Sequence, residues 1–163
     1  MEFSFTPEQQ QITDAISKIC KRFDDTFWLE KDRTGDFPDE FCAALATDGW
    51  LGIAMPESYG GAGLGMTEAA LMMQAIAESG AAMSGCSAIH MNIFSPNVIV
   101  VFGTEEQKAR MLPPLIEGQT RACFAVTEPD AGLDTTHLQT QALREGDHLS
   151  LIHISEPTRL GMI

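Results

Sequence analysis

Apolar residues at helical spacing are the feature of this sequence that most restricts its fold. Over most of the chain they recur every three or four residues, which places them on one face of an α-helix. The first stripe consists of Ile12, Ala15, Ile16, Ile19, Cys20 and Phe23, and a later one of Phe41, Ala44 and Leu45. Long β-branched runs are few, which also favours helix. The sequence therefore predicts a mainly α fold with these stripes packed in the core.

Capping residues, glycines and prolines indicate where the helices begin and end. The pattern Thr-x-x-Gln at residues 6–9, and again at 104–107, is typical of a capping box at a helix start. Residues 96–103 are β-branched enough for a strand, but they also fit a buried helix that ends at Gly103, and we expect the helix. About six helices are expected, near residues 7–23, 26–32, 36–49, 66–77, 96–103 and 104–114.

Neither the glycine-rich loop nor the cysteines predict a binding site. Residues 57–65 lack the spacing of the phosphate-binding loops, so we expect a turn that packs tightly against a neighbour. The cysteines show no metal-ligand spacing and each lies within an apolar pattern. We expect no metal site, and packed, reduced thiols at Cys20, Cys42, Cys86 and Cys123.

The charge and composition of the chain argue against a nucleic-acid-binding protein and a membrane protein. The chain has 163 residues and a formal net charge of −13, with Lys and Arg together numbering 10. Cations so few and scattered cannot form a basic face, which argues against a nucleic-acid partner. The hydrophobic content of 44% suits a soluble globular protein. No secretory signal follows Met1 and no apolar stretch has the length of a membrane span, so we expect a cytoplasmic location.

Residues 121–136 are the part of the chain best suited to bind a ligand. An apolar run that fits a buried strand breaks at Thr127, and the Glu-Pro pair after it forces an extended turn. Gly132 has no side chain, so the backbone there can approach a ligand or a neighbouring segment closely. A strand end with a hydroxyl and free backbone amides suits a flat polar ligand. After this segment, polar and apolar residues alternate over 138–143, which predicts an exposed strand. Residues 144–147 are expected to form a hairpin turn.

Four segments together have the order and spacing of one known family. They are Gly-Trp-Leu-Gly-Ile (49–53) with Pro-Glu-Ser-Tyr-Gly-Gly (56–61), Gly-Thr-Glu-Glu-Gln-Lys (103–108), Leu-Pro-Pro-Leu (112–115), and Ala-Val-Thr-Glu-Pro (125–129) with Ala131, Gly132 and Asp134. Over about residues 3–148 the sequence thus resembles the N-terminal part of the acyl-CoA dehydrogenase family.

The resemblance implies a fold and a reaction. It implies an N-terminal helical bundle followed by the first strands of a truncated β-barrel domain, and, in complete members, a C-terminal four-helix bundle. FAD lies between barrel and bundle, a C-terminal glutamate removes the α-proton, and the flavin takes the β-hydride to give a 2-enoyl-CoA. The implied partners are an acyl-CoA substrate and an electron-transfer flavoprotein, and the parent protein is implied to be a homodimer or homotetramer.

Carried onto this sequence, the family's flavin contacts fall on Phe124, Ala125, Val126 and Thr127. The resemblance implies that Phe124 packs against the flavin. It also implies that the Val126 amide and the Thr127 hydroxyl donate hydrogen bonds to the pyrimidine edge. Donors there would stabilise the negative charge that gathers on N1 and O2 when the flavin is reduced.

The implied substrate contacts are Leu133 and His90. Leu133 stands where the family frequently has a serine that helps to hold the CoA portion, and leucine cannot donate that hydrogen bond. Residues 87–94 resemble the helix that lines the acyl pocket, where His90 would limit chain length. A hydrogen-bonded structural role is the alternative for this histidine. Asp134 matches the family and is expected to cap a turn.

The expected domains are residues 1–119 (helical), 120–148 (the start of the β-barrel domain) and 149–163 (a tail). From Ser150 onward the sequence resembles a translated sequencing-library adapter, read through at the end of a short insert. We expect these residues not to be native protein. The alternative is a divergent strand that ends in a Ser-Glu-Pro turn.

Other functions stay open on the same fold. An acyl-CoA oxidase or a flavin monooxygenase would differ in how oxygen reaches the reduced flavin. A helical interaction domain without flavin chemistry is an alternative of another class, although such a domain has no need of the turn at residues 126–129. We expect a chain without the family's C-terminal glutamate to be inactive as a dehydrogenase.

Overall fold

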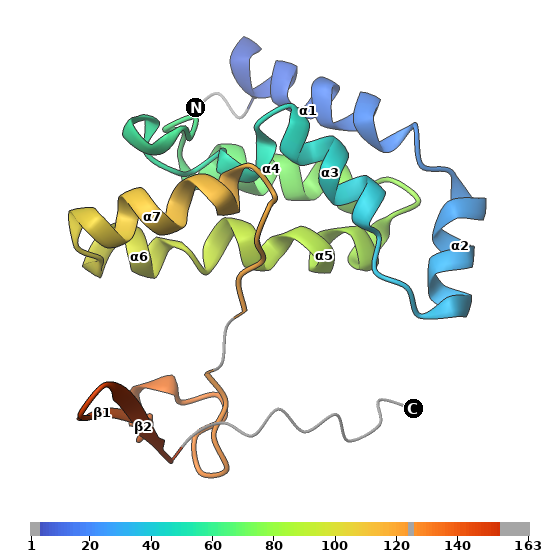
Figure 1. Ribbon diagram of the computed structural model, residues 1–163. Coiled ribbons are helices and arrows are strands. Elements are labelled where there is room, and N and C mark those ends of the chain that lie inside the picture. Colours follow the sequence, from blue (N-terminus) through green and yellow to red (C-terminus); the bar gives the residue numbers. More distant parts are fainter. Residues whose placement is uncertain (1–3, 124–125, 154–163) are drawn as a thin grey trace. The chain divides into compact units, whose positions relative to one another are not determined.

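The computed structural model describes residues 4–123 and 126–153, and the chain divides after Cys123 into two units. We call residues 4–123 the helical unit and residues 126–153 the hairpin unit (Figure 1). The helical unit contains α1 (Pro7–Cys20), α2 (Asp25–Thr34), α3 (Asp39–Thr47), η1 (Trp50–Gly52), η2 (Glu57–Tyr59), α4 (Met66–Ala77), α5 (Ala82–Phe94), α6 (Asn97–Phe102) and α7 (Glu105–Ile116). The hairpin unit contains η3 (Thr135–His137), β1 (Gln141–Glu145) and β2 (His148–Ile152).

Both predicted capping boxes are present. At the start of α1 the Thr6 hydroxyl accepts from the Gln9 amide at 3.2 Å, and the Gln9 side chain accepts from the Thr6 amide at 3.1 Å. Thr104 and Gln107 make the same two bonds at the start of α7, at 3.2 and 2.8 Å. Each box satisfies two amides that the first helical turn leaves without intrahelical partners.

Residues 97–102 are helical, as expected, but the expectation of a buried helix is wrong, because no residue of α6 is buried and Phe102 is 81% exposed. Gly103 ends α6, as expected, in an extended conformation (φ −68°, ψ 147°), and the chain passes directly into the extended N-cap Thr104 of α7. α7 itself continues past the expected end through Pro113 and Pro114 to Ile116. The buried side chains of Leu115 and Ile116 account for this, since they pack only if the last turn stays helical.

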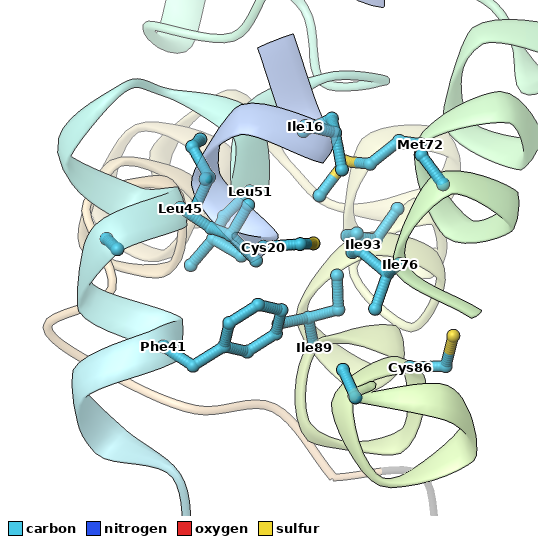
Figure 2. Close-up of a cluster of buried hydrophobic side chains, with 14 of the residues drawn as sticks. Ile16, Cys20, Phe41, Leu45, Leu51, Met72, Ile76, Cys86, Ile89 and Ile93 are labelled. Carbon is cyan, nitrogen blue, oxygen red and sulfur yellow. The ribbon is translucent and has the colours of Figure 1, made fainter. Parts of the chain in front are cut away.

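Two clusters of buried hydrophobic residues lie in the helical unit, and Figure 2 shows the centre of the larger one. The side chains of Ile16, Phe41, Leu45, Met72 and Ile76 have no exposed surface. They come from α1, α3 and α4, and α4 packs against both α1 and α5. The predicted inner faces of α1 and α3 and the central place of α4 are thus confirmed.

The glycine-rich loop packs tightly, as predicted, against the segment that precedes it. Its backbone bonds to residues 52–55: the Ala62 amide donates to the Gly52 carbonyl at 2.9 Å, and the Gly63 amide to the Met55 carbonyl at 2.8 Å. A Cβ added at Gly61 would collide with the Met55 carbonyl. Glycine is therefore required at this position for close approach of two backbones.

The four cysteines are free, but they are not all packed. Cys20 and Cys86 are buried and Cys42 is half-buried, in agreement with the prediction. Cys123 is exposed, so the expectation of a packed thiol is wrong there. The reason is that Cys123 follows the last contacts of the helical unit, beyond α7, where no helix covers it.

Burial raises the pKa of the Cys42 thiol from an ordinary 9.0 to about 11. Between these values the folded chain keeps a proton that the unfolded chain loses, so the free energy of unfolding falls as pH rises. We expect urea unfolding at about pH 8 and about pH 10.5 to show a larger loss for wild type than for Cys42→Ala. Cys123→Ala should keep the wild-type loss. Equal losses in wild type and Cys42→Ala would contradict this account.

The predicted buried strand at residues 121–127 is wrong for the residues that the structure describes. Residues 121–123, 126 and 127 have no regular structure. A strand needs a neighbour for its backbone amides and carbonyls, and within residues 4–123 and 126–153 no strand lies beside this run.

The predicted hairpin is present, with its first strand three residues later than expected. β1 and β2 pair antiparallel, with Glu145 opposite His148 across a turn at residues 146–147. Gly146 takes the left-handed conformation (φ 67°) that such a turn needs. β2 includes Ser150–Ile152, and the expected Ser-Glu-Pro turn lies outside the described residues. That these residues are not native protein stays a prediction.

The expectation that no apolar stretch has the length of a membrane span needs correction. The helical run Ala82–Phe102, which joins α5 and α6, has 21 residues. By length and composition alone it meets the test for a helix that could cross a membrane. Core helices of soluble proteins pass the same test. Here Ile89 and Ile93 of α5 are buried against the rest of the bundle, whereas Val101 and Phe102 of α6 are exposed, and 33% of the apolar window is buried.

Candidate functional site

The predicted flavin-contacting residues that the structure describes are Val126 and Thr127, at the start of the hairpin unit. Val126 is half-buried and Thr127 is exposed. Among the described residues, no group accepts from the Val126 amide and none pairs with the Thr127 hydroxyl. Within the part of the chain that the structure describes, both donors are thus without a protein acceptor. Phe124 and Ala125, the other two predicted contacts, lie outside the described residues.

A tight turn follows Thr127. The Glu128 amide donates to the Ala131 carbonyl at 3.0 Å, and the Ala131 amide donates to the Glu128 carbonyl at 3.2 Å. Pro129 and Asp130 form the tip between them, and proline's fixed φ favours a turn there. Ala131 is buried. This turn is the one expected from the Glu-Pro pair.

The Glu128 carboxylate ties this turn to the start of β1. Its Oε2 accepts from the Gln139 amide at 2.8 Å, and its Oε1 accepts from the Thr140 amide at 2.7 Å and from the Thr140 hydroxyl at 2.5 Å. Only 8% of Glu128 is exposed. The bond from the Thr140 hydroxyl and that from the Gln139 amide hold the pKa of this carboxyl below its ordinary value.

In the helical unit, the last residues before Phe124 are anchored by Asn92 of α5. Its Nδ2 donates to the Thr120 carbonyl at 3.0 Å, and its Oδ1 accepts from the Ala122 amide at 2.8 Å. Asn92 is buried, with 8% of its surface exposed. A buried amide side chain that satisfies both a carbonyl and an amide fixes the backbone between them.

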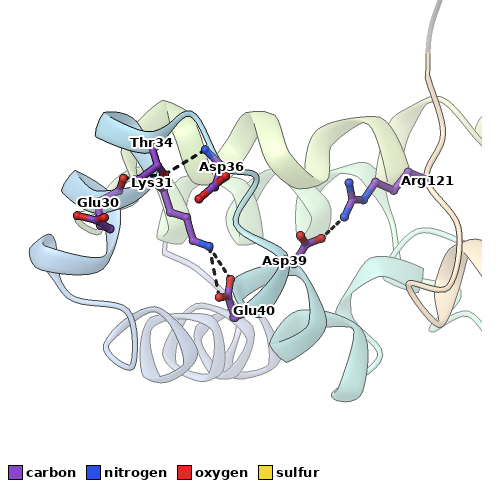
Figure 3. A network of polar contacts seen from close by, with 7 residues as sticks. All are labelled: Glu30, Lys31, Thr34, Asp36, Asp39, Glu40 and Arg121. Atoms are coloured by element: carbon purple, nitrogen blue, oxygen red, sulfur yellow. Dashed lines mark hydrogen bonds and ion pairs between the residues drawn. The ribbon is translucent and has the colours of Figure 1, made fainter.

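Arg121 supplies a second anchor on the same segment. Its guanidinium pairs with the carboxylate of Asp39 at the start of α3 (Figure 3). It also lies 3.9 Å from the centroid of the Phe37 ring. A cavity of about 200 Å³ is lined by these two charged residues, by Cys42 and by Asn92, among others. Because the charges that line it pair with each other, the cavity offers no unpaired charge to a ligand.

The two predicted substrate contacts are both exposed. His90, on α5 of the helical unit, lies with its ring 5.3 Å from that of Phe94. Leu133, in the hairpin unit, is fully exposed. Neither has the buried surroundings of a structural core residue. The predicted turn-capping role of Asp134 is present, because its carboxylate accepts from the Thr136 amide at 3.2 Å.

Asn92 and Glu128 are the two functional candidates that sequence reasoning missed. A signal for Asn92 exists: it is a polar residue at helical spacing from Ile89 and Cys86, both apolar residues of α5. Polar side chains on a buried face need partners, so such a residue indicates an anchor. Glu128 carries no comparable signal, because its partners are 11 and 12 residues away along the chain.

Comparison with known proteins gives consistent matches. A family model described as the acyl-CoA dehydrogenase N-terminal domain matches residues 6–119. Acyl-CoA dehydrogenase FadE12 of Mycobacterium tuberculosis is 34% identical over 148 residues, which are 88% of this chain and 37% of that protein. The 3-(aryl)acrylate reductase of Clostridium sporogenes is 38% identical over 152 residues, 90% of this chain and 39% of that protein.

The fold is also that of a solved structure. The structure of the glutaryl-coenzyme A dehydrogenase glutaryl-CoA complex superposes with a TM-score of 0.80 at 26% identity, over 93% of this chain and 39% of that one. The chain thus spans less than half the length of the relatives that it matches.

Proposed function

Because the chain belongs to the acyl-CoA dehydrogenase family, we propose that Val126 and Thr127 are part of an FAD site in an enzyme that oxidises acyl-CoA thioesters to 2-enoyl-CoA. Acyl-CoA dehydrogenases of this family are FAD-dependent flavoproteins. The observation that carries the proposal is a pair of donors, the Val126 amide and the Thr127 hydroxyl, that have no acceptor among the described residues and lie beside a hydrogen-bonded turn.

The donors fit the chemistry of a flavin. The pyrimidine edge of the flavin presents acceptors at N1 and O2, and bound FAD supplies the acceptor for the hydride. The Val126 amide and the Thr127 hydroxyl would hold that edge. Phe124 and Ala125 complete the proposed contact set.

The acid next to these donors is unsuited to remove the substrate's α-proton. The carboxylate of Glu128 already accepts three hydrogen bonds, and its pKa is lowered, which makes it a weak base at neutral pH. We therefore propose that the base comes from elsewhere in the family's architecture, and that the 163-residue chain alone oxidises no acyl-CoA.

The proposed substrate contacts are His90 and Leu133, whose exposure leaves both free to touch an acyl-CoA. The proposed electron acceptor is an electron-transfer flavoprotein, the proposed assembly of the parent is a homodimer or homotetramer, and the proposed location is the cytoplasm.

An acyl-CoA oxidase or flavin monooxygenase would use the same donors. The reverse reaction, reduction in place of oxidation, is a second candidate, because the Clostridium sporogenes relative is named as a reductase.

Replacing Thr127 with valine tests the proposal. Valine has nearly the same shape as threonine but cannot donate, so we expect the dissociation constant for FAD to rise about tenfold, or about 1.4 kcal/mol. Titration of the isotope-labelled chain with FAD, followed by amide NMR, measures the constant even where binding is weak. Thr135→Val, at an exposed threonine of η3, is the matched control and should bind as wild type does. Equal affinity of Thr127→Val and wild type would refute the assignment.

A further inference from the structure

We propose that Glu128 is the positioning residue of this flavin site. Its carboxylate locks the turn after Thr127 to the segment that leads into β1, and the lock fixes where the Val126 and Thr127 donors lie. The inference rests on the proposed function, since it assigns a role toward the flavin that Val126 and Thr127 are proposed to contact.

The geometry of the lock is the first argument. Donors from two consecutive residues, Gln139 and Thr140, converge on the two oxygens of one carboxylate at 2.8 and 2.7 Å. The backbone of Glu128 is bonded at the same time, because its amide and carbonyl both pair with Ala131. Thr127 is thus followed directly by a residue held through its main chain and its side chain, which leaves little freedom to the adjoining peptide.

The burial of this charge is the second argument. Only 8% of Glu128 is exposed, and within residues 4–123 and 126–153 no cation lies within 4.0 Å of its carboxylate. Hydrogen bonds from two backbone amides and a hydroxyl are the main stabilisation of the charge, and His153 adds a weaker electrostatic one. A buried carboxylate held in this way imposes one geometry, because any displacement leaves the charge without its donors.

Position along the chain is the third argument. The donors assigned to the flavin lie one and two residues before Glu128, whereas β1 begins one residue after Thr140. The lock therefore joins the proposed flavin contacts to the first strand of the hairpin unit. Preorganised donors contribute more to binding than mobile ones, because the ligand does not have to order them.

The isosteric variant Glu128→Gln tests the lock. An amide offers one oxygen where the carboxylate offers two, so either the Gln139 amide or the Thr140 amide loses its acceptor. We expect faster hydrogen exchange at one of these amides, measured by NMR. We also expect the dissociation constant for FAD to rise at least tenfold, with smaller FAD-induced shifts of the Val126 and Thr127 amide signals.

Asp134→Asn is the matched control. It removes one negative charge from the hairpin unit, as Glu128→Gln does. The Asp134 carboxylate caps η3 and makes no bond to the Glu128 turn, so that turn keeps its contacts. This variant should bind FAD within twofold of wild type, which separates positioning from a general effect of charge or stability. The proposal is overturned if Glu128→Gln loses amide protection yet binds FAD as wild type does, if the Gln139 and Thr140 amides stay protected, or if Asp134→Asn weakens binding equally. A wild-type chain without FAD-induced shifts at Val126 and Thr127 refutes the proposed function itself, and this inference with it.

Discussion

Replacing Phe41 with alanine is expected to lower the free energy of unfolding by about 3–5 kcal/mol. Phe41 has no exposed surface and lies at the centre of the helical unit's core (Figure 2). Its ring makes edge-on contacts with the rings of Phe23 and Trp28, at centroid distances of 5.4 and 5.1 Å. Truncation therefore removes both buried apolar surface and aromatic contacts, and it leaves a cavity that rigid helices refill only in part.

Urea unfolding followed by circular dichroism measures this loss. Phe102→Ala is the matched control, because Phe102 on α6 is 81% exposed, and its truncation should change the free energy of unfolding by less than about 0.5 kcal/mol. Similar losses for the two variants would contradict the central place of Phe41 in the core of the helical unit.

Replacing Asn92 with leucine is expected to cost about 3 kcal/mol of unfolding free energy, because it leaves two backbone groups without their partners. The Ala122 amide loses its acceptor at 2.8 Å and the Thr120 carbonyl its donor at 3.0 Å. Leucine has as many side-chain heavy atoms as asparagine but a larger volume, so overpacking at this buried position adds to the loss. The anchor of the segment before Phe124 is what the variant removes.

Two measurements check this prediction. Chemical denaturation gives the loss of stability, and amide hydrogen exchange at Ala122 reports the local anchor. Asn97→Leu, the same change at an exposed position of α6, should leave both unchanged. If Ala122 kept its wild-type exchange rate in Asn92→Leu, Asn92 would not be the anchor that we describe.

The helical unit could be predicted from the sequence because its determinants are local. Thr6 with Gln9, and Thr104 with Gln107, define helix starts within four residues, and the stripe through Phe41 and Leu45 identifies a buried face. Such signals act over one or two helical turns, and the structure follows them closely. The hairpin was predicted for the same reason, from a turn with Gly146 at its tip.

The site could be predicted only in outline because its determinants are not local. Thr127 was identified from the resemblance to a family, yet the expected strand around it is not formed, since a strand depends on a partner that the local sequence does not specify. Asn92 bonds to residues 28 and 30 positions away, and Glu128 to residues 11 and 12 positions away. Spacing and composition do not encode such pairs.

Residue-resolved titration with flavin tests the central claim most directly. The account predicts that FAD and FMN, which share the isoalloxazine ring, shift the amide signals of Val126 and Thr127 in the labelled chain, and that ADP, which lacks the ring, leaves them unchanged. Shifts produced equally by ADP, or no shift from FMN at these two residues, would contradict the assignment of Val126 and Thr127 to a flavin's pyrimidine edge.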